Sequence, residues 1–95
     1  MAAYVVVEID VTDPVPYEDY KQQAPRSIAE HGGRYLARGG ACQALEGGWA
    51  PRRLVILEFP NAAQARAWWE SESYREPKAL RQRSANTRMV LIEGT

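Results

Sequence analysis

The sequence predicts an α+β domain in which helices cover one face of a four-stranded sheet and leave the other open. Four segments rich in β-branched and large apolar residues indicate strands. Apolar residues recur at helical spacing after the first and after the third of these segments. The resulting order is βαββαβ. Two right-handed βαβ units then place the strands in the spatial order 4-1-3-2, in a sheet of antiparallel type.

The first strand is predicted at residues 3–11, which alternate and are rich in Val and Ile. A helix is predicted to begin next, because either Thr12 or Asp13 can cap its free N–H groups and Pro14 suits the first helical position. The apolar face of this helix consists of Tyr17, Tyr20, Ala24 and Ile28. Pro25 removes a hydrogen bond to the carbonyl of Lys21, so a kink or a break is expected there.

The second and third strands are predicted at residues 34–38 and 53–59, and residues 41–45 are a candidate extension of the second. The loop between them is rich in glycine and carries Trp49, either as a lid over a site or as a plug at a subunit contact. The third strand is a nearly continuous apolar run, as in a central strand. Glu58 interrupts it, and a carboxylate in that position must either find a partner or shift its pKa.

Two helices are predicted after the third strand. Asn61 and Gln64 resemble a capping box, and the buried side of the first helix is expected to consist of Ala65, Trp68 and Trp69. Ser73 and Glu76 form a second capping signature, which predicts another helix from Tyr74 to about Arg83. Its basic residues are interpreted as a solvated face: Arg75, Lys78, Arg81 and Arg83. The last strand is predicted at residues 87–93.

Strand parity separates a helix-covered face from an open one. The covered face should carry Ala3, Val5, Val7, Ile9, Val55, Leu57, Phe59, Met89 and Leu91. The open face should carry Tyr4, Val6, Glu8, Arg34, Leu36, Arg38, Leu54, Ile56, Glu58, Arg88, Val90 and Ile92. The first and third strands are expected to be neighbours that run parallel, with the outer strands running the other way. Two carboxylates and two guanidiniums should then converge at one edge: Glu8, Glu58, Arg34 and Arg88. Arg38 and Tyr4 then fall at the opposite edge.

Composition excludes several classes of protein. The 95 residues form one domain, 1–95, and the formal net charge of zero argues against nucleic-acid binding. No apolar run reaches the roughly 18 residues of a membrane span, and no signal peptide is evident, so a cytoplasmic location is expected. One cysteine, Cys42, and one histidine, His31, exclude a structural zinc site within one chain. We expect neither a metal nor a cofactor.

Several segments together resemble a known family: residues 8–14, 31–39, 45–47, 49–51, 57–60, 65–68, 73–74, 87–88 and 93–94. They are similar to the bacterial domain-of-unknown-function family thirteen-thirty, within the dimeric α+β barrel superfamily. The resemblance implies a ferredoxin-like fold and dimers joined face to face, and it implies no catalytic residues. Relatives in the wider superfamily include cofactor-free monooxygenases, small-molecule isomerases, and dehalogenating or haem-degrading enzymes.

Two hypotheses about function remain open. In the first, a homodimer binds a small, partly apolar and acidic molecule between sheet and loop, and a cofactor-free enzyme is included in this hypothesis. Its candidate ligand-binding residues are Glu8, Arg34, Arg38, Trp49, Glu58 and Arg88. In the second, the dimer is a non-catalytic structural or interaction module, and the charged residues only set the register of the subunits. His31, at a helix end, fits a capping role better than catalysis.

Overall fold

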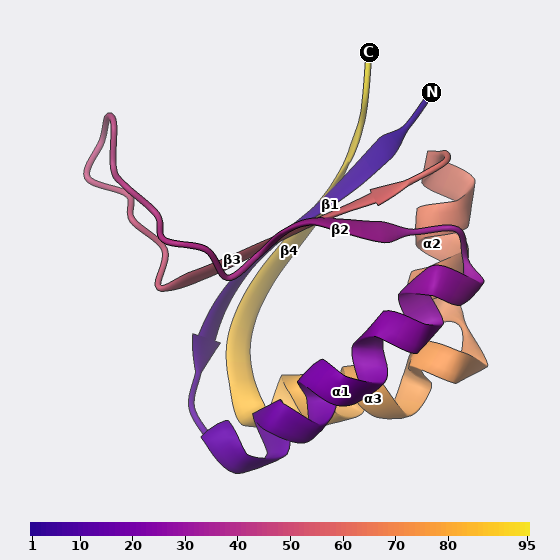
Figure 1. Cartoon of the computed structure of the whole chain (residues 1–95), viewed down its shortest axis with the longest axis horizontal. Helices are drawn as coiled ribbons and strands as arrows, with labels where there is room; N and C mark the ends of the chain where they lie inside the picture. Colours follow the sequence, from indigo (N-terminus) through magenta and orange to yellow (C-terminus); the bar gives the residue numbers. More distant parts are fainter.

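A computed structural model covers residues 1–95 and contains seven regular elements. In chain order they are β1 (Ala3–Val11), α1 (Pro14–Glu30), β2 (Arg34–Arg38), β3 (Arg53–Phe59), α2 (Ala62–Glu70), α3 (Glu72–Ser84) and β4 (Ala85–Glu93). The helices lie together on one side of the sheet (Figure 1). None of them is both long and apolar enough to span a membrane.

The strands form one sheet in the order β2-β3-β1-β4, which confirms the predicted order 4-1-3-2. Every neighbouring pair is antiparallel, including β1 with β3. The prediction that the first and third strands run parallel is therefore wrong. In this topology β2 runs in the same direction as β1, and β3 reverses direction before it inserts between them.

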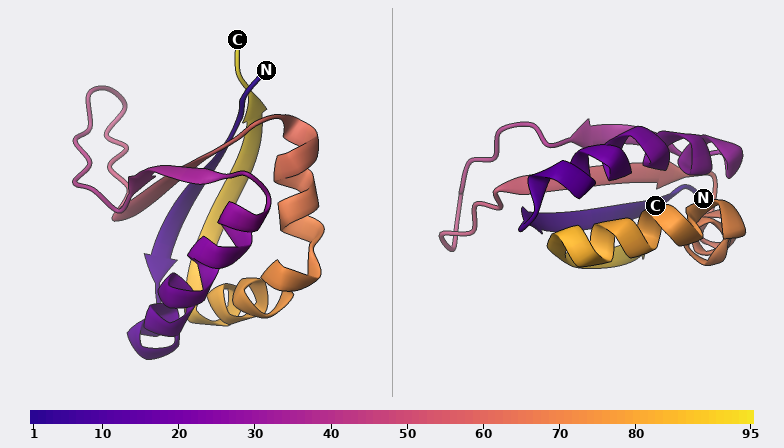
Figure 2. Two further views of the ribbon diagram at one scale, coloured as in Figure 1. Left: turned by 45° about the vertical axis from the view of Figure 1, so that its right-hand side comes forward. Right: turned by 90° about the horizontal axis from the view of Figure 1, so that it is seen from below.

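The predicted parity of β1, β3 and β4 is confirmed. Alternate residues of β1 from Ala3 to Ile9 are almost fully buried, and Leu57 and Phe59 of β3 join them. These side chains pack against α1, α2 and α3 in one core that includes Tyr17, Ile28, Trp68 and Tyr74. Large apolar residues remain exposed on the other face of the sheet: Leu36 (47%), Val90 (58%) and Ile92 (57%). Helices cover only the first of these two faces (Figure 2).

Helix α1 continues through Pro25 without the break that was predicted as one of two outcomes. The carbonyl of Lys21, which has no partner at residue 25, accepts a hydrogen bond from Nη2 of Arg38 at 2.5 Å. This contact comes from β2 and replaces the missing helical bond. It accounts for a proline within a continuous helix.

Helix α2 has the predicted cap, because the Asn61 side chain accepts a hydrogen bond from the backbone N–H of Gln64 at 2.8 Å. Helix α3 begins at Glu72, earlier than predicted. Its N-cap is Ser71, whose Oγ accepts a hydrogen bond from the N–H of Tyr74. The capping signature assigned to Ser73 was therefore two residues late, and the short break between the helices lies at Ser71 alone.

Residues 39–52 form an irregular segment, here called the arm, between β2 and β3. The predicted extension of the second strand over residues 41–45 is absent, and the arm extends away from the helices (Figure 1). Gly39 begins it with φ of +74°, and a Cβ at that position would collide with the guanidinium of Arg53. The guanidinium can move aside, but residues with a Cβ rarely adopt this left-handed φ, so the conformation at the base of the arm favours glycine.

Candidate functional site

The two predicted carboxylates share the open face but lie at opposite ends of it. In the antiparallel register, Glu8 lies opposite Leu54, whereas Glu58 lies opposite Tyr4. The two positions are four residues apart along β1, roughly 13 Å at a rise of about 3.3 Å per residue. The predicted convergence of Glu8 and Glu58 is therefore wrong, and so is the placement of Tyr4 at the edge away from Glu58.

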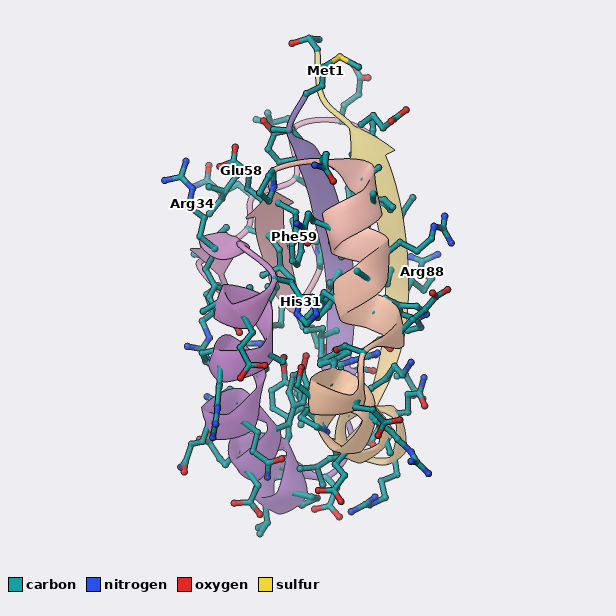
Figure 3. The ribbon with its side chains drawn as sticks, turned by 90° about the vertical axis from the view of Figure 1, so that its right-hand side faces the viewer. Met1, His31, Arg34, Glu58, Phe59 and Arg88 are labelled. Carbon is teal, nitrogen blue, oxygen red and sulfur yellow. The ribbon has the colours of Figure 1, made fainter.

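Each carboxylate has its own arginine on a neighbouring strand. Arg88 lies directly across from Glu8, and its Nε donates to Oε1 of Glu8 at 2.7 Å. Arg34 lies directly across from Glu58, and its Nε donates to Oε1 of Glu58 at 2.8 Å. Arg34 and Glu58 lie together at one edge of the sheet, whereas Arg88 lies at the other (Figure 3). The four predicted residues thus form two separate ion pairs.

Arg38 is absent from the open face. A register shift between Tyr35 and Ala37 places Arg38 opposite Val55, a residue of the covered face. Its guanidinium lies 4.5 Å from the ring centroid of Tyr35 and bonds the carbonyl of Lys21 on α1. The prediction placed a bulge or a stop at Gly39-Gly40. The irregularity lies two to three residues earlier and turns Arg38 toward the helices.

Trp49 completes the cluster around Glu8. Its indole Nε1 donates a hydrogen bond to Oε2 of Glu8 at 2.9 Å, and this contact ties the arm back to the sheet. The hydrogen bond from Trp49, followed by that from Arg88, holds the pKa of Glu8 below its usual value. Glu8 is therefore a stably ionised carboxylate near neutral pH. It is a poor proton donor, and its chemistry is that of a fixed acceptor.

A cleft of about 430 Å³ adjoins this cluster. Its walls come from β1, the base of the arm and β4, and its charged lining residues are Glu8, Asp10, Arg52 and Arg88. Arg52 and Asp10 form a loose pair at 3.9 Å. The cleft thus unites three segments that are distant in sequence, and Glu8 and Arg88 are the two predicted site residues in it.

The chain is similar to known proteins both in family and in fold. The family model described as "Domain of unknown function (DUF1330)" matches residues 2–95. The chain belongs to the DUF1330 family. No curated protein matches it.

Solved structures show the same fold as this DUF1330 chain. A protein of unknown function from Rhodopseudomonas palustris superposes with a TM-score of 0.79 at 17% identity, over 99% of this chain and 82% of that one. A dimeric ferredoxin-like protein of unknown function from Jannaschia has a TM-score of 0.68 at 12% identity, over 99% and 100%. The cofactor-independent oxygenase SnoaB from Streptomyces nogalater has a TM-score of 0.67 at 8% identity, over 99% and 93%. The predicted ferredoxin-like fold is confirmed.

His31 has the predicted place at the end of a helix in this DUF1330 chain. It is the C-cap residue of α1, and its Nδ1 lies 2.8 Å from the carbonyl oxygen of Ser27. Because a carbonyl only accepts, Nδ1 carries the proton in this contact. The imidazole thus binds a free carbonyl of the last helical turn, as a capping residue does.

A buried series of hydrogen-bonded side chains in this DUF1330 domain was not predicted from the sequence. Arg81 is 2% exposed, although it was interpreted as part of a solvated basic face. Its Nε donates to the hydroxyl of Tyr74, which lies 2.9 Å from that of Tyr20, and its Nη1 donates to Oγ1 of Thr87. Burial raises the pKa of the Tyr20 phenol. The available signal was spacing: the buried residues of α3 include Tyr74, Pro77, Arg81 and Ser84, one helical stripe.

Proposed function

We propose that this DUF1330 protein is a homodimer that joins two helix-free sheet faces and binds a small, partly apolar acid beside Trp49. One observation carries the proposal: three large aliphatic side chains are about half exposed on a sheet face that no element of the chain covers. Exposed apolar patches of this kind mark interaction surfaces. The Jannaschia protein with the same fold is described as dimeric.

The shape and charge of the open face suit a second copy. The Cα trace measures 36 × 33 × 16 Å, a thin slab of one helical layer on one sheet. Its broad side exceeds the roughly 800 Å² that each partner contributes to a standard interface. Both ion pairs on the open face are neutral overall, Glu8 with Arg88 and Glu58 with Arg34. A two-fold copy therefore meets no block of like charge.

The cluster around Glu8 favours an acidic ligand, because its unused groups are donors. Both oxygens of Glu8 accept hydrogen bonds, one from Arg88 and one from Trp49. Arg88 gives two of its five N–H groups to Glu8, and its side chain is 80% exposed. A carboxylate in the cleft can accept hydrogen bonds from the remaining N–H groups, while Ile9, Ala50 and Pro51 supply apolar lining.

Glu8 suits the binding of a ligand better than acid catalysis. Because the pKa of Glu8 is lowered, this carboxylate lacks the raised pKa that a general acid needs near neutral pH. SnoaB, with the same fold, is a cofactor-independent oxygenase. A reaction on the bound acid without a cofactor is a further part of the same hypothesis, and it would require a group other than Glu8 as acid.

The test is a thermal-shift screen of small carboxylic acids on three proteins: wild type, Arg88→Gln and Arg34→Gln. The control is closely matched, because Arg34 also pairs with a carboxylate on the open face but lies at the other end. We expect acids to stabilise the wild type and Arg34→Gln. Arg88→Gln should weaken binding by about 10- to 100-fold, the worth of a hydrogen bond to a charged group.

Two outcomes would contradict the binding proposal. The first is a wild type that responds to no acid. The second is an equal loss in Arg34→Gln and Arg88→Gln, which would point to general charge attraction. If no acid binds and both substitutions only lower the stability of the dimer, the alternative is favoured, in which the ion pairs set subunit register.

A further inference from the structure

A second cavity lies on the other side of the sheet, between α2 and the covered faces of β1 and β4. Its volume is about 180 Å³. Val5, Met89 and Leu91 line it from the sheet, and residues of α2 form the other wall. Ala65 is the smallest residue of that wall, which leaves space beneath the helix. Because β4 is an edge strand, its residues Met89 and Leu91 are only partly buried there. In Figure 3, α2 lies in front of β1 and β4.

Two indole rings give the cavity a rigid aromatic wall. Trp68 is 1% exposed, its Nε1 donates to Oγ of Ser27, and its ring lies 4.2 Å from that of Tyr74. Nζ of Lys78 lies 4.4 Å from the centre of the Trp69 ring and donates to the Trp69 carbonyl. Contacts outside the cavity thus hold both rings in place. A ligand would meet a preformed surface, which reduces the entropy lost on binding.

The one charged residue that lines this cavity is Arg66. Of the twelve basic residues in the chain, ten have a side-chain hydrogen bond, an ion pair or an aromatic ring as partner. Arg66 and Arg83 have none. An unpaired guanidinium beside an apolar cavity is complementary to a ligand with one apolar part and one negative charge.

We propose that this cavity binds a single-ring aromatic monocarboxylate, with the ring against Trp69, in front of the buried Trp68, and the carboxylate on Arg66. The size agrees, because an apolar protein cavity of about 150 Å³ is known to hold benzene. The additional volume leaves room for a short acidic substituent. Ring packing against an indole in an offset or edge arrangement is favourable. This site is independent of the cleft at Glu8, which lies on the opposite face.

Phenylacetate is the probe, and the indole N–H signals in ¹H–¹⁵N spectra of the full chain are the readout. The protein has three tryptophans, so the two sites report separately. Binding in the cavity should move the signals of Trp68 and Trp69 in a saturable way, whereas binding in the cleft should move that of Trp49. Signals are assigned with Trp49→Phe and Trp69→Phe.

The controls follow from the two unpaired arginines. Arg66→Gln should weaken phenylacetate binding about 10-fold, and Arg83→Gln should leave it unchanged. The neutral 2-phenylethanol should bind the wild type about as weakly as phenylacetate binds Arg66→Gln. The proposal is overturned if Trp68 and Trp69 do not respond, if both arginine variants lose affinity equally, or if the alcohol binds as well as the acid. A response of Trp49 alone would overturn this site and leave the cleft at Glu8 standing.

Discussion

Gly33 lies between the end of α1 and the start of β2, where the backbone passes close to the core. A Cβ at this position would lie 2.5 Å from Cε1 of Phe59 and 2.8 Å from Cγ2 of Ile28. Both neighbours are almost fully buried in the core, so they can move only by disturbing its packing. The close approach therefore explains the glycine at this position. A left-handed φ does not, because the φ of Gly33 is not positive.

We expect Gly33→Ala to lower the free energy of unfolding by about 1–3 kcal/mol, the usual cost of overpacking a core. Gly40→Ala is the control, because nothing lies within 4 Å of a Cβ there. Both substitutions restrict the unfolded chain similarly, so the difference between them isolates the clash. Urea unfolding measures it. Equal stabilities of the two variants would show that the backbone moves aside without cost.

Single residues also show what could and could not be predicted about the site from the sequence. The faces of Glu8 and Glu58 follow from alternation alone, which is a local property of a strand. The separation of these two carboxylates depends on strand direction. The order βαββαβ already determines that direction, and the prediction that the first and third strands run parallel did not follow it. Arg38 depends on a register shift in β2, and Trp49 depends on the path of an irregular arm. No periodicity in the sequence encodes either of these.

Among the elements, α1 and β2 depend on each other through Pro25. The proline leaves the carbonyl of Lys21 without its helical donor, and Arg38 supplies a donor from β2. Arg38 reaches this carbonyl only because the register shift turns it toward the helices. The proline in α1 and the register shift in β2 thus compensate for each other.

A double-mutant cycle tests this compensation. Arg38→Met removes the donor and keeps most of the aliphatic stem, so it should cost about 1 kcal/mol plus the loss of the contact with Tyr35. In a Pro25→Ala background the carbonyl of Lys21 regains a backbone donor, and the cost of Arg38→Met should fall by about 1 kcal/mol. The ring contact and the unfolded-state effect of proline cancel in the cycle. A coupling free energy near zero would refute the link between the two elements.

Helix α3 joins the other helices to β4 through polar groups in the interior. The hydroxyl of Tyr74 contacts Tyr20 on α1, and the Arg81 guanidinium contacts Thr87 on β4. Nη2 of Arg81 has no hydrogen-bond partner, although the residue is buried. The guanidinium lies 5.8 Å from the centre of the Trp69 ring, which offers favourable contact with a cation. The positive charge of Arg81 is therefore stabilised by uncharged hydroxyl groups and by the face of an aromatic ring.

At the scale of the whole molecule, the fold leaves the chain short of buried surface. A domain of this length buries only about 60–65% of the surface that its unfolded chain exposes. One layer of helices covers one face of the sheet, and the other face presents aliphatic side chains to water. Joining two such faces converts a two-layer slab into a structure with a sheet-on-sheet centre. The arm beside this face, which is tied to it by Trp49, would border the contact.

Val90→Lys should convert the proposed dimer to a monomer. Val90 lies near the middle of β4 on the open face and is 58% exposed. A two-fold contact contains each position twice, so the substitution would bury two unpaired charges, at a cost of several kcal/mol. Val15→Lys is the control, because Val15 is 75% exposed on α1 and lies outside the sheet. Light scattering behind size exclusion should give a dimeric mass for the wild type and Val15→Lys and a monomeric mass for Val90→Lys, with a dissociation constant raised by more than about 100-fold. A monomeric wild type, or a dimer that survives Val90→Lys, would mean that the sheet faces do not meet.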